Sequence, residues 1–98
     1  MPKLMRLDQK TVRDPEYLFW CPGCGDNHWF KTTGKEPRWT FNGDMERPTV
    51  HASILVKSAN RESDRTCHLF IQDGRIQYLN DCSHDLAGQT VNMEDVGQ

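Results

Sequence analysis

The sequence lacks the features that mark a membrane protein or a secreted protein. No apolar run approaches the roughly 18 residues that a membrane helix needs, and the longest are YLFWC (residues 17–21) and SILV (residues 53–56). The N-terminal segment contains basic residues but has no apolar region typical of a secretory signal. We therefore predict a soluble protein of the cytoplasm that does not contact a membrane.

An excess of positive charge is also missing. The chain has 12 Lys and Arg against 14 Asp and Glu, which gives a formal net charge of -2. The basic residues are scattered among acids, whereas a nucleic-acid-binding surface normally carries a basic stripe. The aromatic residues are then better explained as core and sheet packing than as a stacking platform for bases. The sequence does not favour a nucleic acid as partner.

Sustained helical periodicity is absent, and what is present instead is a series of short aromatic or β-branched runs separated by turn residues. The runs that read as strands are YLFWC (17–21), HWFKTT (28–33), RWTFN (38–42), ASILVKS (52–58) and GQTVNM (88–93). A chain of 98 residues has room for one compact domain. We predict a single zinc-binding domain over residues 1–98, with residues 1–15 and 94–98 flexible. Its expected fold is mainly β: a small antiparallel sheet, zinc-ribbon-like, with little helix.

The clearest element is a C-terminal β-hairpin within TCHLFIQDGRIQYLNDC (residues 66–82). Asp73-Gly74 lies between two apolar runs, which is the strongest short-range hairpin signal in a sequence. The two-residue turn pairs Gln72 with Arg75, Ile71 with Ile76, Leu69 with Tyr78 and His68 with Leu79. Because side chains alternate along a strand, one face is expected to carry Cys67, Leu69, Ile71, Ile76, Tyr78 and Cys82.

The four cysteines are the main chemical signal. Cys21-Pro22-Gly23-Cys24, followed by Gly25, has the form of a zinc knuckle, in which two thiolates turn toward one ion. A redox pair would need a helix that begins at the first cysteine, and the glycines that follow make one unfavourable. Disulfides fit poorly with a protein that has no export signal. We therefore predict a Zn²⁺ ion as cofactor.

A structural zinc site needs four ligands, and the hairpin register nominates the other two. Cys67 and Cys82 are expected on the same face at the open end of the hairpin, which gives the set Cys21, Cys24, Cys67 and Cys82. His68 and His84 are the alternative ligands. In a regular strand His68 points away from Cys67, which argues against both binding one ion, whereas the direction of His84 is open.

A second pattern overlaps with this one. His68, Asp81 and His84 cluster at one end of the predicted hairpin, and an Asp with two histidines can bind a catalytic metal or carry out acid–base chemistry. This trio is a possible functional cluster in addition to the metal ligands. The sequence assigns no catalytic residue.

Several motifs together resemble a known family. FWCPGCG, WTFNGD, RPTVHASI and CHLFIQDGRIQYLNDCSHDLAGQTVNM are similar to segments of small phage and prophage proteins of unknown function, often mislabelled "ammonia monooxygenase". The resemblance spans roughly residues 17 to 93, and Ala52 stands where that family typically has a proline. It implies a metal-binding Cys/His protein of the host cytoplasm if a phage encodes it, and some relatives are encoded near bacterial ubiquitin-like conjugation genes. The monooxygenase label has no support, because that enzyme is a membrane machine.

Two functions follow from these observations. We favour a small accessory protein that acts as a protein-interaction module, with a structural metal and an unidentified protein partner. A bound zinc contributes about 10–16 kcal/mol to a small domain that has few other sources of stability. The alternative is a small metal-dependent hydrolase that uses His68, Asp81 and His84, and a nucleic-acid-binding zinc ribbon ranks below both.

Overall fold

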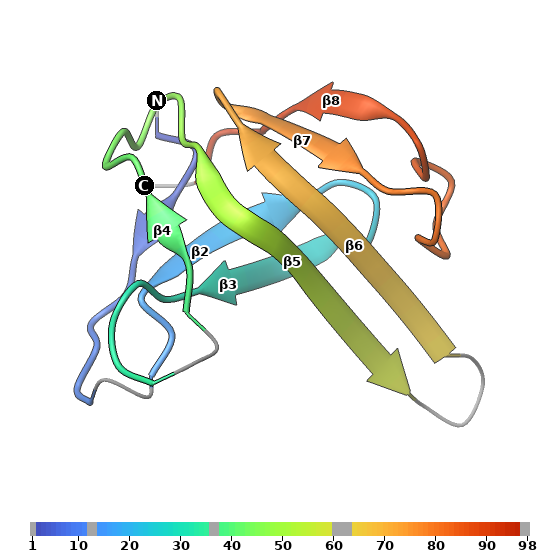
Figure 1. Ribbon diagram of the computed structural model, residues 1–98. Coiled ribbons are helices and arrows are strands. Elements are labelled where there is room, and N and C mark those ends of the chain that lie inside the picture. The colour runs from blue at the N-terminus through green and yellow to red at the C-terminus, as the bar shows by residue number, and fades with distance from the viewer. Residues whose placement is uncertain (1, 12–13, 36–37, 60–63, 97–98) are drawn as a thin grey trace.

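The described part of the chain is built from strands, turns and irregular segments. The computed structural model describes residues 2–11, 14–35, 38–59 and 64–96, and these contain no helix (Figure 1). Within the same ranges, nothing has the helical length and apolar character needed to cross a bilayer. The strands are β1 (Met5–Arg6), β2 (Tyr17–Cys21), β3 (Asp26–Phe30), β4 (Thr40–Phe41), β5 (Val50–Ala59), β6 (Asp64–Gln72), β7 (Arg75–Tyr78) and β8 (Thr90–Asn92). The prediction of a mainly β fold is confirmed.

The strands form two antiparallel sheets where the sequence predicted one. A three-stranded sheet has the order β1-β2-β3, and a five-stranded sheet has the order β4-β5-β6-β7-β8. Figure 1 shows the smaller sheet passing behind β5 and β6. Apolar side chains from both sheets form one core, in which Phe19, Leu69 and Tyr78 are among the largest fully buried side chains. One face of each sheet is therefore buried and the other is open to solvent.

The C-terminal hairpin has the predicted register. Leu69 pairs with Tyr78, Ile71 with Ile76 and Gln72 with Arg75. Asp73 and Gly74 both have positive φ, 52° and 76°, which is the backbone conformation of a type I′ turn. The hairpin is continued by β8, which lies beside β7.

Strand β5 contains an irregularity that the sequence did not reveal. Its pairing with β6 runs from Val50 opposite Ile71 to Ile54 opposite Leu69, so β5 advances by more residues than its partner. A β-bulge of this kind bends a strand and redirects a side chain. Ser53 lies inside the bulge, directly before regular pairing resumes.

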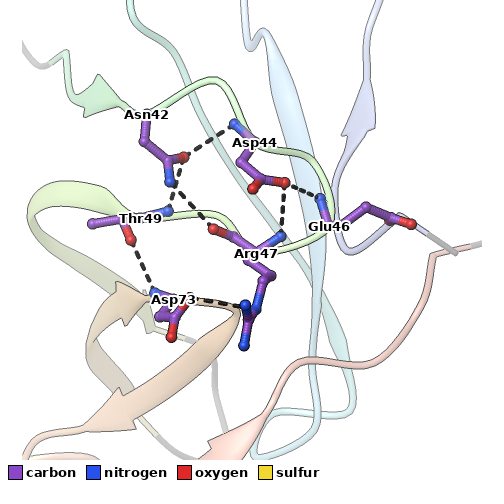
Figure 2. Close-up of polar contacts among 6 residues, drawn as sticks. All are labelled: Asn42, Asp44, Glu46, Arg47, Thr49 and Asp73. Atoms are coloured by element: carbon purple, nitrogen blue, oxygen red, sulfur yellow. Dashed lines mark hydrogen bonds and ion pairs between the residues drawn. The ribbon is translucent and has the colours of Figure 1, made fainter.

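The loop between β4 and β5 is held by its own polar side chains (Figure 2). The side-chain oxygen Oδ1 of Asn42 accepts hydrogen bonds from the backbone amides of Asp44 and Thr49, each at 3.1 Å. The Thr49 hydroxyl accepts a hydrogen bond from the amide of Asp73 at 2.9 Å, and Arg47 pairs with the Asp73 carboxylate at 3.5 Å. These contacts fix the start of β5 against the β6–β7 turn.

Parts of both predicted flexible ends pack onto the domain. Leu4 is buried, and Met5–Arg6 forms strand β1 beside β2. The amide of Val96 donates a hydrogen bond to the carbonyl of Pro2 at 3.0 Å. The flexibility of residues 1–15 and 94–98, like the single-domain organisation of the whole chain, stays a prediction.

Candidate active site and metal centre

The knuckle is the turn that joins β2 to β3. The amide of Gly25 donates to the carbonyl of Cys21 at 2.8 Å, and Gly25 has a φ of 65°, which a side chain would disfavour. Cys21 is buried at the end of β2, and Cys24 is half-buried in the turn. All four cysteines of the chain are free thiols. Both cysteines of the turn are therefore available as ligands.

Four potential ligands meet between this turn and the hairpin. One ligand atom from each of Cys21, Cys24, Cys67 and His84 lies within 4.8 Å of the others. The sulfurs of Cys21 and Cys67 are 3.8 Å apart, and the Cys67 sulfur is 3.5 Å from Nε2 of His84. Zn–S bonds of about 2.3 Å and Zn–N bonds of about 2.0 Å at tetrahedral angles give separations of roughly 3.8 and 3.5 Å. The spacing of these donors fits one tetrahedral ion.

Neighbouring groups hold the cluster in place. The Tyr78 hydroxyl lies 3.1 Å from the Cys21 sulfur and accepts a hydrogen bond from the amide of Gly23 at 3.2 Å. The His84 ring packs edge-on against Tyr78, with ring centroids 4.5 Å apart. The ring also lies directly over Gly23, where an added Cβ would come within 2.4 Å of it. Only glycine at position 23 leaves room for this histidine.

The tautomer of His84 shows what binding would change. The amide of Leu86 donates to Nδ1 of His84 at 3.2 Å, so the ring proton lies on Nε2 and is directed toward the Cys67 sulfur. A histidine that binds a metal ion through Nε2 instead carries its proton on Nδ1. Ligation through Nε2 therefore requires the proton to move to Nδ1 and the Leu86 contact to loosen.

The thiols of the cluster are coupled in their protonation. The contact with Cys67, supported by His28 and Tyr78, lowers the pKa of Cys21 to about 3. The same contact raises the pKa of Cys67, and burial raises the pKa of Cys24 to about 11. The cluster thus favours a single thiolate, because further negative charge in a buried site is unfavourable. A divalent cation would supply the charge that allows all three thiols to ionise.

Cys82 occupies a different position from the other three cysteines. Its sulfur accepts a hydrogen bond from the amide of His68 and donates one to the carbonyl of the same residue, both at 3.2 Å. His84, the alternative ligand, stands fourth in the cluster instead. The side chain of His68 is not part of the cluster and lies on the opposite face of the sheet from Cys67, as the alternation of side chains predicts.

On that opposite face, His68 lies between a serine and an aspartate. Its Nδ1 is 3.1 Å from the Asp81 carboxylate, and its Nε2 is 3.0 Å from Oγ of Ser53. A carboxylate only accepts hydrogen bonds, so Nδ1 carries the proton and Nε2 accepts the one on the serine hydroxyl. This is the geometry of a nucleophile, a general base and a group that orients the base.

The elements of the larger sheet bring the three residues together. Ser53 comes from the bulge of β5, His68 from the neighbouring strand β6, and Asp81 from the turn that follows β7. The indole of Trp39 donates to the carbonyl of Ser53 at 3.0 Å and fixes the bulge from the other side. The side chain of Asp81 is 57% exposed and that of His68 is 24% exposed, so the site is open to water.

The sequence pattern predicts two of these residues and does not single out the serine. The pattern groups His68, Asp81 and His84, and the structure keeps the first two together while His84 lies beside the cysteines. The pattern places Ser53 in an ordinary strand. The signal that would single it out is that its hydroxyl lies two residues before Leu55, the residue that pairs with His68. Of the remaining histidines, His28 is buried beside Phe19 and His51 is exposed at the start of β5.

The fold and the site together define a small β protein with a Ser–His–Asp arrangement on one sheet face and a cysteine–histidine cluster behind it. Residues 2–79 match the family described as "Bacterial ubiquitination-like system serine protease (BubE)", and the chain belongs to this family. The matched region includes Ser53 and His68 and ends shortly before Asp81. Comparison with the curated proteins and with the solved structures gives no significant match. The expected link to a bacterial ubiquitin-like system is confirmed by the family, whereas the phage origin stays a prediction.

Proposed function

We propose that this chain is a serine protease of a bacterial ubiquitination-like system, with Ser53 as nucleophile, His68 as general base and Asp81 as the residue that orients the base. The observation that carries the proposal is the hydrogen-bonded chain from Ser53 through His68 to Asp81. The family description independently supports a serine protease. This proposal replaces the non-catalytic module that the sequence alone favours.

The chemistry follows from the positions of the protons. Oγ of Ser53 attacks the carbonyl carbon of a peptide bond while its proton passes to Nε2 of His68. The imidazolium that forms is stabilised by Asp81 and gives the proton to the departing amine. Water then attacks the acyl-serine ester, with His68 again taking and returning the proton, which releases the acid and regenerates the hydroxyl.

The metal in this proposal is structural. Three thiolates and one imidazole are a soft, closed ligand set that suits Zn²⁺, and it leaves no position open for substrate. We propose Cys21, Cys24, Cys67 and His84 as the ligands, because their separations fit a tetrahedral ion. The ion would cross-link the β2–β3 turn to the hairpin. A metal-dependent hydrolase is less well supported, because His84 lies away from His68 and Asp81.

Protein partners follow from the same assignment. The family belongs to a ubiquitination-like system, so the substrates that we expect are proteins. The sequence predicts a module that binds another protein. In this proposal, that protein is the substrate, and a catalytic domain recognises it.

A serine-directed fluorophosphonate probe tests the proposal directly. The wild-type protein should be labelled at Ser53, as peptide mapping by mass spectrometry would show, and Ser53→Ala should not be labelled. Ser83→Ala is the matched control, because the Ser83 hydroxyl bonds only to the backbone of Thr66 among the contacts described. Labelling of folded protein at another serine, or none at all, would refute the assignment.

A further inference from the structure

A cleft beside the candidate triad is not explained by the chemistry at Ser53. It has a volume of about 380 Å³ and lies between β3 and β5, starting at the residue that follows Ser53. Its lining residues are Pro15, His28, Trp29, Phe30, Lys31, Trp39, Ile54, Leu55, Val56 and Lys57. Trp39, which donates to the carbonyl of Ser53, connects the cleft to the triad.

The walls of the cleft are unusually apolar for exposed surface. Trp29 is 56% exposed and Leu55 is 49% exposed, and they are two of the three large apolar residues that are exposed in the described part of the chain. Exposed aromatic and aliphatic side chains that line a concave surface are typical of a binding site. The cleft therefore suits a ligand with a large apolar group.

The backbone along the cleft is also available for pairing. β4 pairs with β5 only at Val50 and His51, and Figure 1 shows that β4 accompanies only the beginning of β5. Because the carbonyl of Ser53 points to the side where Trp39 lies, the alternation of a strand directs the backbone groups of Leu55 to the same side. Beyond His51, no described strand occupies this edge of β5. Such an edge can accept an additional strand from an extended peptide.

One polar feature narrows the chemistry of the occupant. The lining residues include Lys31 and Lys57 but no carboxylate. The cleft is thus suited to a peptide that brings a negative charge.

We propose that this cleft binds the segment of a protein substrate that precedes the scissile bond, as an extended strand antiparallel to β5. The proposal rests on the protease function of Ser53. Antiparallel pairing is slightly more stable than parallel pairing, and it places residues N-terminal to the cleaved bond along Leu55 and Lys57. A large apolar residue about two positions before the cleaved bond then lies against Trp29 and Leu55. An acidic residue further toward the N-terminus lies near Lys57.

Peptide–coumarin amides test the proposal, because their fluorogenic group takes the place of the leaving amine and they report only on residues before the cleaved bond. In a positional library, the wild-type protein should prefer Phe, Trp or Leu about two positions before the bond, and Asp or Glu further toward the N-terminus. Trp29→Ser and Leu55→Ser should each raise KM about tenfold, with kcat nearly unchanged, since burial of such a side chain contributes to binding. Lys57→Glu should reverse the acidic preference.

Controls and contrary outcomes separate this proposal from the function on which it rests. Met5→Ser removes an exposed apolar side chain outside the cleft and should leave KM unchanged. If cleavage requires Ser53 but the cleft variants keep the wild-type KM and sequence preference, the proposed substrate-binding role of the cleft is wrong and the protease function stands. Labelling of Ser53 without cleavage of any library member would also overturn the role of the cleft, as would cleft variants that change the oligomeric state and not KM. Failure of Ser53 to react with the fluorophosphonate would overturn the protease function itself.

Discussion

Cys67 and His68 are neighbours in β6, and their side chains lie on opposite faces of the same sheet. The sulfur of Cys67 lies 3.8 Å from that of Cys21 in the buried cluster, and Nε2 of His68 lies 3.0 Å from Ser53 on the open face. The same relationship recurs after β7. Asp81 contacts His68 on the open face, whereas His84, three positions later in the chain, contacts the buried cluster. Two of the three segments that form the cysteine–histidine cluster therefore also carry His68 and Asp81.

The two histidines should separate metal binding from catalysis. His68→Ala should retain the metal and the fold but lower kcat by about 10⁴-fold, because the serine loses its base. His84→Ala should lose most of its bound zinc and unfold at a lower temperature. Zinc content, thermal unfolding and hydrolysis of a cleaved peptide measure the three properties. Full zinc occupancy in His84→Ala would contradict the proposed ligand set.

Removal of the metal should inactivate the protein even though no triad residue is a ligand. One zinc per chain is expected in the purified protein by elemental analysis, because soft thiolates select it. Chelation should lower the free energy of unfolding by several kcal/mol, since binding of a structural ion is coupled to folding. Activity should fall in parallel with zinc content and return when zinc is added back. A metal-free protein with undiminished activity would show that the two faces are independent.

The cysteines of the hairpin should differ in their effects. Cys67→Ser should lose zinc and several kcal/mol of stability, because the thiolate is a ligand in the proposed site. Cys82→Ser should keep zinc, since its sulfur bonds only to the backbone of His68 in the contacts described, and it should cost about 1 kcal/mol. Zinc loss from Cys82→Ser with Cys67→Ser unaffected would restore the all-cysteine set predicted from the sequence.

A glycine pair in the knuckle tests the position of His84. Gly23→Ala places a Cβ within 2.4 Å of the His84 ring and should reduce zinc affinity by displacing the ring. Gly25→Ala is the matched control, because its Cβ would meet nothing within 4 Å. Because residue 25 has a positive φ, the alanine should lower the free energy of unfolding by about 1 kcal/mol without affecting the ligands. Competition with a chromophoric chelator measures zinc affinity, and equal affinity in the two variants would contradict the stacked position of the ring.

The sequence predicts most of what depends on local rules. The hairpin register follows from Asp73-Gly74 and from the alternation of side chains, and with it the separation of His68 from Cys67. The knuckle at Cys21 and Cys24 is likewise a local motif. The choice between Cys82 and His84 as the fourth ligand is different, because it depends on how the chain turns after β7. In that turn the Cys82 sulfur meets the His68 backbone and the His84 ring enters the space above Gly23.

The position of Ser53 could not be predicted from the periodicity of the sequence. Its segment reads as a plain strand, and the bulge that presents its hydroxyl to His68 arises from pairing with β6 and from the Trp39 indole, both distant in sequence. The division into two sheets is also not predictable from the sequence pattern, because the strands of both sheets have similar aromatic and β-branched composition. Only tertiary contacts decide which strands pair.

The bulge in β5 also limits how the length of the chain can vary at this point. Val50 and Ile54 both face the core, although β5 uses four residue steps between them and β6 uses two from Ile71 to Leu69. Deletion of a single residue between Val50 and Ile54 would turn every later side chain of β5 to the opposite face and expose Ile54. Deletion of two would keep the core in place but remove the irregularity that presents Ser53. Insertions and deletions that preserve the fold are therefore expected here in pairs of residues, and only the present length also preserves the position of Ser53 beside His68.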